Sequence, residues 1–282
     1  MSKNKVKILV ACHKPDTIFQ NEVYIPIHVG RSVSKFKKEM ADMIGDDTGE
    51  NISSKNPFYC ELTAQYWAWK NLDCEYIGLC HYRRYFEQKV TEDNIDHLLG
   101  DNYDAMCIQR IYDVNSSSTR LIMASSLDDF QIFMYALKIV SPQMLEYAKI
   151  FLKKGEITPY NMFVMKKQLF SDFAEWQFAV LAEMEKHIRL SGYSRARRIY
   201  GYYAEMMLPI YLGYNKRKIR YSPCVRMVGD CSKREFLTKL RTLYLKFLNK
   251  LCNTPIMYDI DAVIVGFKAD GINVGYIDKI ND

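Results

Sequence analysis

Short apolar runs alternate with helical patterns along the first part of the chain. Each run has the length of a buried strand, whereas the segments between them repeat apolar positions at helical spacing. The predicted strands cover residues 7–12, 75–80 and 103–108, and the predicted helices cover residues 59–71 and 91–99. Strands that alternate with helices are typical of a mainly parallel sheet. The pattern therefore predicts an α/β fold, with a mostly parallel sheet flanked by helices.

Helical patterns dominate the second half of the chain. A long pattern over residues 127–152 is broken at Ser141 and Pro142, because a proline cannot continue a helix. The Ser-rich stretch 112–119 before it has the composition of a flexible loop. Together these segments predict a helical insertion or lid at about residues 113–157. Further helices are predicted at residues 171–190 and 199–212, and a closing strand at residues 221–228.

The last predicted helix, residues 233–251, is amphipathic, with basic residues around an apolar stripe. The stripe consists of Phe236, Leu237, Leu240, Leu243, Tyr244, Phe247, Leu248 and Leu251, and the basic residues are Lys233, Arg234, Lys239, Arg241, Lys246 and Lys250. This pattern is typical of a helix lying on an anionic membrane surface, and equally of a helix that packs on a core. We divide the chain into a main domain, residues 1–228, and a C-terminal basic amphipathic helix and tail, residues 229–282.

Composition narrows the class of protein. The chain has 282 residues, 49% of them hydrophobic, which is enough for one large core with an appendage. The eight cysteines are scattered, without metal-ligand spacing, and we interpret them as reduced thiols of a cytoplasmic protein. The N-terminal apolar run is too short for a signal peptide, and no apolar stretch is long enough to span a bilayer. The net charge of +6 does not by itself require an anionic polymer as partner.

Three blocks of sequence carry a resemblance to a known family. They are KILVACHKP, YIPIHVG and IGDDTGENIS within residues 7–53, then NPFYCELTAQYWAWKNLDCEYIGLCHYRRYF at residues 56–86, and finally YNMFVM at residues 160–165 with GYYAE at residues 201–205. Together they resemble the bacterial domain of unknown function 4422 family, whose members are placed among capsule and exopolysaccharide glycosyltransferases. The resemblance extends over residues 7–225 and implies a Rossmann-related fold of the GT-A type. The chain departs from the family at residues 120–130, where a histidine-bearing stretch is expected.

The resemblance implies transfer of a hexose, with galactose as the first expectation, from a UDP-sugar. The implied acceptor is a lipid-linked or growing surface polysaccharide, so the protein is expected at the inner face of the membrane as a peripheral protein. A non-catalytic nucleotide- or glycan-binding partner of a polysaccharide assembly complex is the alternative. Basic clusters near residues 195–198 and 216–220 would suit nucleic acid, but no helix-turn-helix, zinc or RNA-binding signature accompanies them. We therefore expect no nucleic-acid partner.

Polar residues follow two of the predicted strands. His13 and Lys14 follow the first strand, whereas His81, Arg83 and Arg84 follow strand 75–80. Ligands of open α/β sheets bind at the carboxyl ends of strands. Many GT-A enzymes hold a divalent cation there with an Asp-x-Asp motif, but arginines bind phosphate directly and carry permanent charge. We therefore predict a donor diphosphate site without an obligatory metal, while Mn²⁺ or Mg²⁺ remains the alternative.

Roles are assigned to individual residues from their positions and side-chain chemistry. His13, Lys14, Arg83 and Arg84 are assigned to donor binding, and His81 to catalysis. A contact of His81 with a metal or a phosphate, and a purely structural hydrogen bond, are its alternatives. Asp47 and Asn51, in a loop with Asp46 and Glu50, are assigned to the donor ribose or sugar, or else form a solvated turn. Asn161 is the candidate acceptor-binding amide, with a buried structural amide as the alternative.

Glu205 is the candidate catalytic base. It lies among Tyr202, Tyr203, Met206 and Met207, and burial there would raise its pKa toward that of a general base. A solvent-facing helix glutamate is the alternative. Glu61 is interpreted as a helix-dipole residue with no required role in catalysis. The pairs Asp128–Asp129 and Asp259–Asp261 are interpreted as surface or capping residues.

Overall fold

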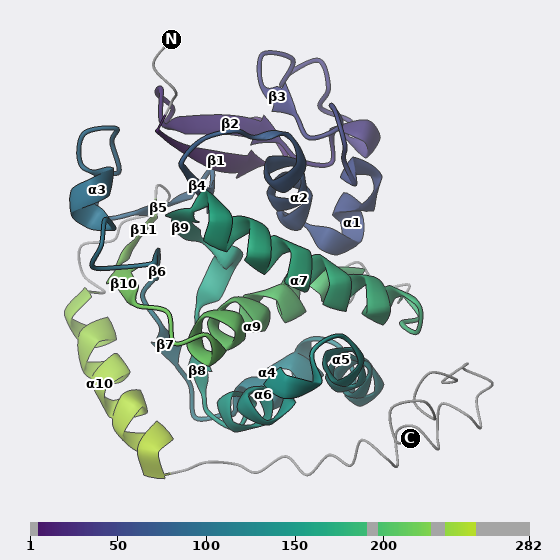
Figure 1. The fold of residues 1–282 in the computed structure, drawn as a ribbon, viewed down its shortest axis with the longest axis vertical. Coiled ribbons are helices and arrows are strands. Elements are labelled where there is room, and N and C mark those ends of the chain that lie inside the picture. Colours follow the sequence, from purple (N-terminus) through teal and green to yellow (C-terminus); the bar gives the residue numbers. More distant parts are fainter. Residues whose placement is uncertain (1–4, 191–196, 227–234, 252–282) are drawn as a thin grey trace.

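The computed structural model describes residues 5–190, 197–226 and 235–251. Its centre is a nine-stranded sheet in the order β10-β6-β9-β4-β1-β2-β3, with β5 and β11 beside this path (Figure 1). The strands are β1 (Val6–Cys12), β2 (Tyr24–His28), β3 (Ile44–Gly45), β4 (Tyr76–His81), β5 (Arg84–Phe86), β6 (Ala105–Ile108), β9 (Phe163–Lys166), β10 (Ile219–Ser222) and β11 (Cys224–Arg226). A separate ribbon pairs β7 (Ile111–Tyr112) with β8 (Glu156–Ile157). The mostly parallel α/β fold expected from the sequence is confirmed.

The strand directions place several loops at one edge of the sheet. β1 runs parallel to β2 and β4, and β2 runs parallel to β3. The carboxyl ends of these four strands therefore lie on the same edge, where ligands of α/β folds bind. β9 is antiparallel to both β4 and β6, so the sheet is mixed rather than purely parallel.

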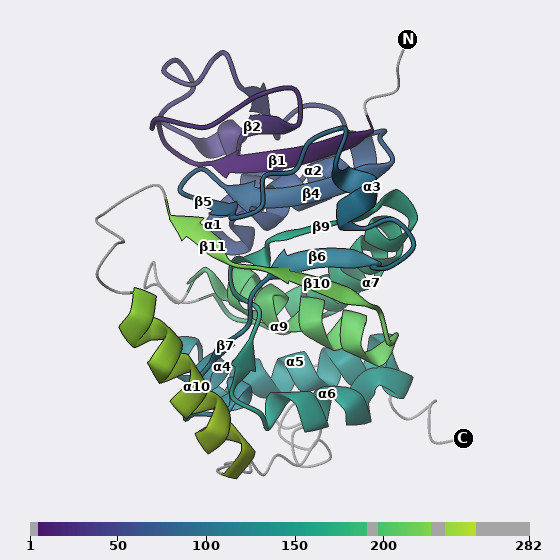
Figure 2. The ribbon, with the colours of Figure 1, turned by 90° about the vertical axis from the view of Figure 1, so that its left-hand side faces the viewer.

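The predicted closing strand 221–228 is two strands in the structure. β10 pairs with β6, and after Pro223 the chain leaves that ladder and β11 pairs antiparallel with β5 (Figure 2). Pro223 lacks the N–H that a continuous ladder needs, which explains the break. β5 forms a tight hairpin with the end of β4, through the pair His81 and Arg84. Residues 227 and 228 lie outside the described residues.

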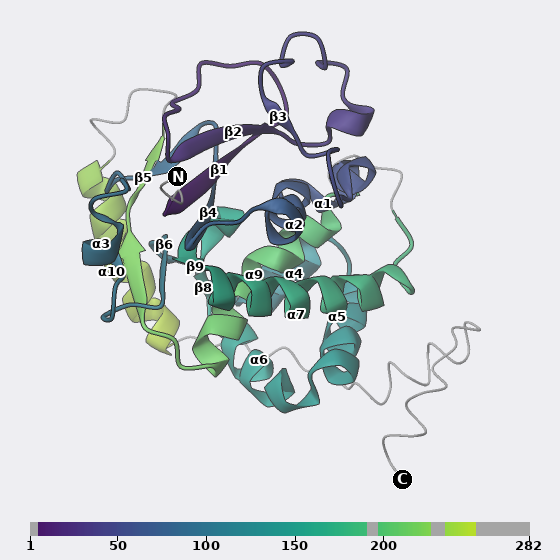
Figure 3. The ribbon, with the colours of Figure 1, turned by 45° about the horizontal axis from the view of Figure 1, so that its top comes forward.

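Helices cover both faces of the sheet. They are α1 (Asn56–Tyr59), α2 (Leu62–Asn71), α3 (Ile95–Leu98), α4 (Ser117–Ala124), α5 (Leu127–Val140), α6 (Leu145–Leu152), α7 (Lys167–Glu185), α9 (Ile199–Tyr214) and α10 (Glu235–Leu251), with single 3-10 turns η1 (Arg31–Val33), η2 (Ser53–Lys55), η3 (Pro142–Met144) and η4 (Pro159–Asn161). Figure 3 shows α2, α7 and α9 on one side of the strands, with α5 and α6 beyond them. α3 packs in the core of the opposite face.

Two predictions, one of a helix and one of a loop, need correction. The single helix expected at residues 59–71 is interrupted at Cys60, whose φ of 55° and ψ of −130° are not helical. The Ser-rich stretch 112–119 is not a flexible loop. Ser116 accepts the Thr119 N–H and caps α4, while Ser117 and Ser118 are buried and donate to backbone carbonyls near residues 152–156. Serine hydroxyls that bond to the backbone order a segment that composition alone suggests is loose.

The helices of the predicted insertion share a core with the rest of the domain. Buried residues of α4, α5 and α6 belong to the same apolar cluster as those of α2, α7 and α9. The predicted break at Ser141–Pro142 is confirmed, because α5 ends at Val140 and a 3-10 turn precedes α6. Asp128 and Asp129 lie in the first turn of α5, as expected of capping residues, whereas Asp259 and Asp261 lie outside the described residues. The lid function and the domain boundaries stay predictions.

The described part of the C-terminal region is the helix α10. It confirms the predicted helix from Glu235 onward, while the predicted residues 233 and 234 lie outside the described part of the chain. Within the described residues, no helix is long and apolar enough to cross a lipid bilayer. The six cysteines that the structure describes are free thiols.

Candidate functional site

A cluster of positive side chains lies at the carboxyl ends of β1 and β4. His13 and Lys14 follow β1, and Arg83 lies in the turn between β4 and β5. Partial burial lowers the pKa of His13, and the nearby charges of Lys14, Arg198 and Arg83 lower it further. His13 is therefore neutral at pH 7, and the two arginines and Lys14 supply the positive charge. Arg198 comes from just before α9, far away in the sequence.

Arg83 already has an anionic partner. Its Nη2 lies 2.6 Å and its Nε 2.8 Å from Oδ2 of Asp16 in the loop after β1. The Asp16 carboxylate therefore neutralises the positive charge of Arg83. The pKa of Asp16 is lowered, first by this hydrogen bond. A ligand phosphate at Arg83 would have to compete with, or join, Asp16.

The residues Tyr160 and Asn161 connect this cluster to the rest of the site. Both have left-handed backbone conformations, with φ of 73° and 50°. Such conformations are unfavourable for side chains larger than glycine and persist where the surroundings hold them. The Nε2 of His81 donates to the Tyr160 carbonyl at 2.7 Å. His81 therefore makes a structural hydrogen bond, which was one alternative to a catalytic role. Its assignment to catalysis stays a prediction.

Two further arginines surround the ring of Tyr160. The guanidinium of Arg84 lies 4.2 Å from the ring centroid, and Nη2 of Arg226 donates to the phenol oxygen at 3.0 Å. Arg84 and Arg226 are also directly opposite each other in the β5–β11 ladder. Like charges opposite each other destabilise a strand pair. A bound anion between them would relieve that repulsion.

Two carboxylates also contact the Tyr160–Asn161 segment. The Asn161 amide donates to Oε1 of Glu61 at 2.7 Å, and Glu61 is 8% exposed. The Tyr160 N–H hydrogen-bonds to Glu205. Burial, and then the charge of Glu61, raises the pKa of Glu205 to about 7. Glu205 is thus close to half ionised at neutral pH, as a general base requires.

The departure from the family pattern at residues 120–130 lies beside these carboxylates. Arg120, in α4, lowers the pKa of Glu205 through its positive charge, as does Arg198. Nη1 of Arg120 is itself 2.7 Å from Oδ2 of Asp113. This segment therefore supplies positive charge near Glu205 in a chain that lacks the expected histidine.

The non-helical residue Cys60 joins the carboxylates to the basic cluster. Nε of Arg198 donates to its Sγ at 3.2 Å. Gly201 packs against the same side chain, and a Cβ at this glycine would lie 3.3 Å from Sγ. Burial raises the pKa of the Cys60 thiol to about 11, so it is protonated at neutral pH. Cys60 therefore positions α1 and α9 and is not suited to act as a nucleophile.

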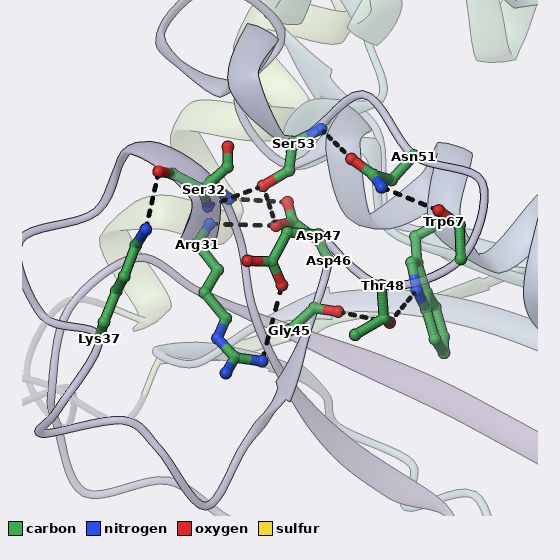
Figure 4. Close-up of polar contacts among 12 residues, drawn as sticks. Arg31, Ser32, Lys37, Gly45, Asp46, Asp47, Thr48, Asn51, Ser53 and Trp67 are labelled. Atoms are coloured by element: carbon green, nitrogen blue, oxygen red, sulfur yellow. Dashed lines mark hydrogen bonds and ion pairs between the residues drawn. The ribbon is translucent and has the colours of Figure 1, made fainter.

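The loop at residues 45–53 is a separate polar region at the ends of β2 and β3. Asp46 is 0% exposed and accepts hydrogen bonds from the backbone N–H groups of Gly30 and Arg31, at 2.7 and 3.1 Å, and from the Ser53 hydroxyl (Figure 4). The Asn51 amide donates to the Gly49 carbonyl and accepts the Ser53 N–H. These side chains order the loop to which they belong.

Asp47 is a partly exposed member of the predicted donor contacts in that loop. Its Oδ1 lies 3.6 Å from Nη1 of Arg31, and its side chain is 27% exposed. The Arg31 side chain lies over Gly45, where an added Cβ would meet it at 2.3 Å. Asp47 and Arg31 therefore flank the carboxyl end of β3, on the same edge of the sheet as His13 but two strands away.

The structure therefore brings together most of the predicted site residues. These are His13, Lys14, His81, Arg83, Arg84, Asn161 and Glu205. Sequence reasoning missed Glu61, Tyr160 and Arg226, and it considered Arg198 only as part of a basic loop. Glu61 lies at the N-terminus of α2, as predicted, but its contact with Asn161 could not be read from helical spacing. Among the described residues, no group of three or more His, Cys, Asp or Glu side chains could hold a metal ion.

Comparisons with known proteins identify the family of this chain and a structural neighbour. The sequence profile described as Domain of unknown function (DUF4422) matches residues 7–216. The apo structure of WbbM, a bifunctional glycosyltransferase, is 26% identical, with a TM-score of 0.68 over 80% of this chain. The chain spans 46% of WbbM, which is less than half of that protein. No curated protein sequence matches the chain.

Proposed function

Because this chain belongs to the DUF4422 family, we propose that it is a glycosyltransferase that moves a hexose from a UDP-sugar to a lipid-linked or growing surface polysaccharide. The similarity to WbbM supports glycosyl transfer as the class of reaction. Galactose remains the first candidate for the sugar, by analogy with the family.

In this proposal the arginines bind the donor diphosphate. Arg84 and Arg226 present two permanent charges to one space beside Tyr160, and Arg83, Arg198 and Lys14 extend the basic surface toward β1. Charge-assisted hydrogen bonds from guanidinium groups are strong and match phosphate geometry. They would stabilise the charge that develops on the leaving diphosphate. Asp47 is retained as a donor contact, and a contact by Asn51 would cost the hydrogen bonds within its loop.

Glu205 is the proposed general base. A carboxylate with a pKa near 7 can accept the proton of an acceptor hydroxyl as that oxygen attacks the sugar. Burial, and then the charge of Glu61, keeps the pKa of Glu205 raised, and Asn161 holds Glu61 in place. Asn161 therefore acts as a positioning residue here, and its Nδ2 is already engaged before any acceptor binds, whereas its Oδ1 has no hydrogen-bond partner among the described residues.

One observation carries the proposal. Tyr160 and Asn161, in adjoining left-handed conformations, contact Arg84 and Arg226 through the Tyr160 side chain, and contact both carboxylates through the Tyr160 N–H and the Asn161 amide. Neutralising the leaving diphosphate is a task of every such sugar transfer, and abstraction of the acceptor proton by a carboxylate is the further task of an inverting one. The proposed diphosphate site relies on arginines, and Mn²⁺ or Mg²⁺ dependence stays the alternative to be tested.

The test is a thermal unfolding panel with UDP, GDP, CDP, UDP-galactose and UDP-glucose, in Mn²⁺ and in chelator. A ligand that binds only the folded state raises the free energy of unfolding, by about 2.7 kcal/mol at a hundred times its Kd. The unfolding temperature rises as a result. We expect a selective rise with uridine nucleotides that persists in chelator. Slow release of UDP from UDP-galactose would then indicate catalysis.

Each other outcome has a definite meaning. A rise that disappears in chelator would replace the arginine mechanism by a metal-dependent one. Binding with no release or transfer at any pH would favour a non-catalytic nucleotide-binding partner. No rise with any nucleotide would overturn the proposal.

A further inference from the structure

The helix α10 rests on the domain by one face only. Asn249 is buried there, and its amide donates to the Asp113 carbonyl at 3.0 Å. On the same side the helix contacts the β7 strand, and Leu245 and Leu248 are half-buried. In Figures 1 and 2 the helix runs along the margin of the molecule. Its outer face is therefore available to another surface.

The outer face of α10 is apolar. Its exposed side chains recur at spacings of three and four residues, which places them on one stripe opposite Asn249. They are Leu240, Leu243, Tyr244, Phe247 and Leu251, with exposed fractions of 49%, 65%, 62%, 61% and 66%. No other segment of the described chain exposes such a series of large apolar side chains. A contiguous apolar stripe of this kind marks an interaction surface.

The charges beside the stripe identify the partner. Arg241 borders it on one side and Lys246 on the other, and both are exposed. The helix sequence contains no acidic residue from Phe236 to Leu251. A second copy of α10 packed on this stripe would bring basic borders against basic borders. An anionic lipid surface offers both apolar depth and negative charge, so it matches the stripe and its borders together.

We propose that α10 lies in the plane of an anionic membrane surface. The stripe around Leu243 and Phe247 enters the boundary between headgroups and acyl chains, while Arg241 contacts lipid phosphates. Lys246, whose Nζ lies 5.8 Å from the centroid of the Tyr112 ring, adds positive charge at the border with the domain. The helix has 17 residues and is about 25 Å long, which gives it a contact along the surface rather than through the bilayer. This proposal is independent of the reaction proposed above.

The test is co-sedimentation of the full chain with vesicles. We expect binding to vesicles containing phosphatidylglycerol, and much weaker binding to phosphatidylcholine alone. Replacing Leu243 and Phe247 by serine should weaken binding at least about tenfold, because each loses buried apolar area. The matched control is Ile150→Ser in α6, a side chain that is 59% exposed away from the stripe and should leave binding unchanged.

Charge and self-association provide the remaining outcomes. Arg241→Glu should weaken binding to phosphatidylglycerol vesicles, and added salt should weaken it in the unchanged chain. No binding to either kind of vesicle would overturn the proposal, as would equal loss in the Ile150→Ser control. A dimer in solution that Leu243→Ser and Phe247→Ser dissociate, without vesicle binding, would assign the stripe to a second copy instead. Unfolding temperatures confirm that each variant remains folded.

Discussion

Two polar regions lie on the same edge of the sheet, and they differ in how their side chains are satisfied. In the loop at residues 45–53, Asp46 and Asn51 direct their hydrogen bonds to that loop and its neighbouring turns. Around Tyr160, by contrast, arginines and two carboxylates gather, and the pKa of Glu205 is raised to about 7.

This difference separates polar clusters that stabilise the fold from clusters that can take part in a reaction. A carboxylate that accepts several backbone N–H groups stabilises a fold, because those donors would otherwise be buried without a partner. A carboxylate held near another carboxylate, in a partly buried site, keeps a high pKa and can take up a proton. Both regions contain acidic and amide residues, so residue type alone does not separate them.

The substitution Glu205→Gln is the strongest test of the difference between the two regions. The amide fills the same space but cannot accept a proton, so we expect kcat to fall by about 10²–10⁴-fold while nucleotide affinity is kept. Turnover of UDP-galactose and the unfolding temperature are the measurements. The matched control is Glu175→Gln on the exposed face of α7, which should leave both unchanged.

The pH dependence follows from the same side chain. Below pH 7, Glu205 is protonated, so kcat/KM should fall by about tenfold per pH unit on the acidic side. Its pKa in the folded chain is above the ordinary value of 4.5, so the folded state binds more protons between these two values. Stability should therefore decrease as pH rises from 4.5 to 7, and Glu205→Gln should remove that part of the decrease. An activity profile flat through pH 7 would contradict the assignment of Glu205 as the base.

Asp46→Ala tests the other region. It removes the acceptor of three hydrogen bonds and leaves the buried N–H groups of Gly30 and Arg31 without it, so we expect a loss of about 3 kcal/mol in the free energy of unfolding. Urea denaturation measures the loss. The neighbouring variant Asp47→Ala is the control, because Asp47 is part-exposed and makes one 3.6 Å ion pair. Asp47→Ala should change stability little, and weaker UDP-sugar binding in it would support the predicted donor contact.

Arg84→Ala tests the proposed diphosphate site. Loss of a charge-assisted contact should weaken UDP binding by about 10–100-fold without unfolding the protein. Arg83→Ala should also weaken UDP binding, though less, because Asp16 already neutralises Arg83. Calorimetric titration with UDP provides the affinities. The matched control is Arg217→Ala. Nη1 of Arg217 lies 3.7 Å from Oδ1 of Asp104, at a surface away from the proposed site. Equal UDP affinity in the Arg83, Arg84 and Arg217 variants would remove the arginine assignment.

The smallest expected effect comes from Asp16→Asn. The change removes the negative charge that holds Arg83, so UDP should bind a few times more tightly, about threefold, at low salt. The gain should shrink as ionic strength rises, since the contact is near the surface. Tighter binding of this kind would indicate that Asp16 competes with phosphate for Arg83. Weaker binding would indicate that Asp16 helps to orient the arginine.

Much of the fold could be predicted from the chain alone. The strand at residues 7–12, the strand at residues 75–80 and the helical break at Ser141–Pro142 depend on local apolar runs and on proline, and all three were confirmed. The prediction of a flexible loop at residues 112–119 was wrong, because the order of this segment depends on hydrogen bonds to carbonyls near residues 152–156. The site was predicted where residues follow a strand directly, as His13 and Arg83 do.

The sequence by itself determined the α/β architecture, the polar edge of the sheet and the amphipathic character of the C-terminal helix, because these depend on periodicity and on residues adjacent in the chain. Only the tertiary structure decided that Glu61 lies beside Asn161, that Arg226 shares Tyr160 with Arg84, and that the apolar stripe of α10 faces outward. These are contacts between distant segments, and they depend on strand order and helix packing. A pKa such as that of Glu205 depends on burial and neighbouring charge, which exist only once those segments have come together.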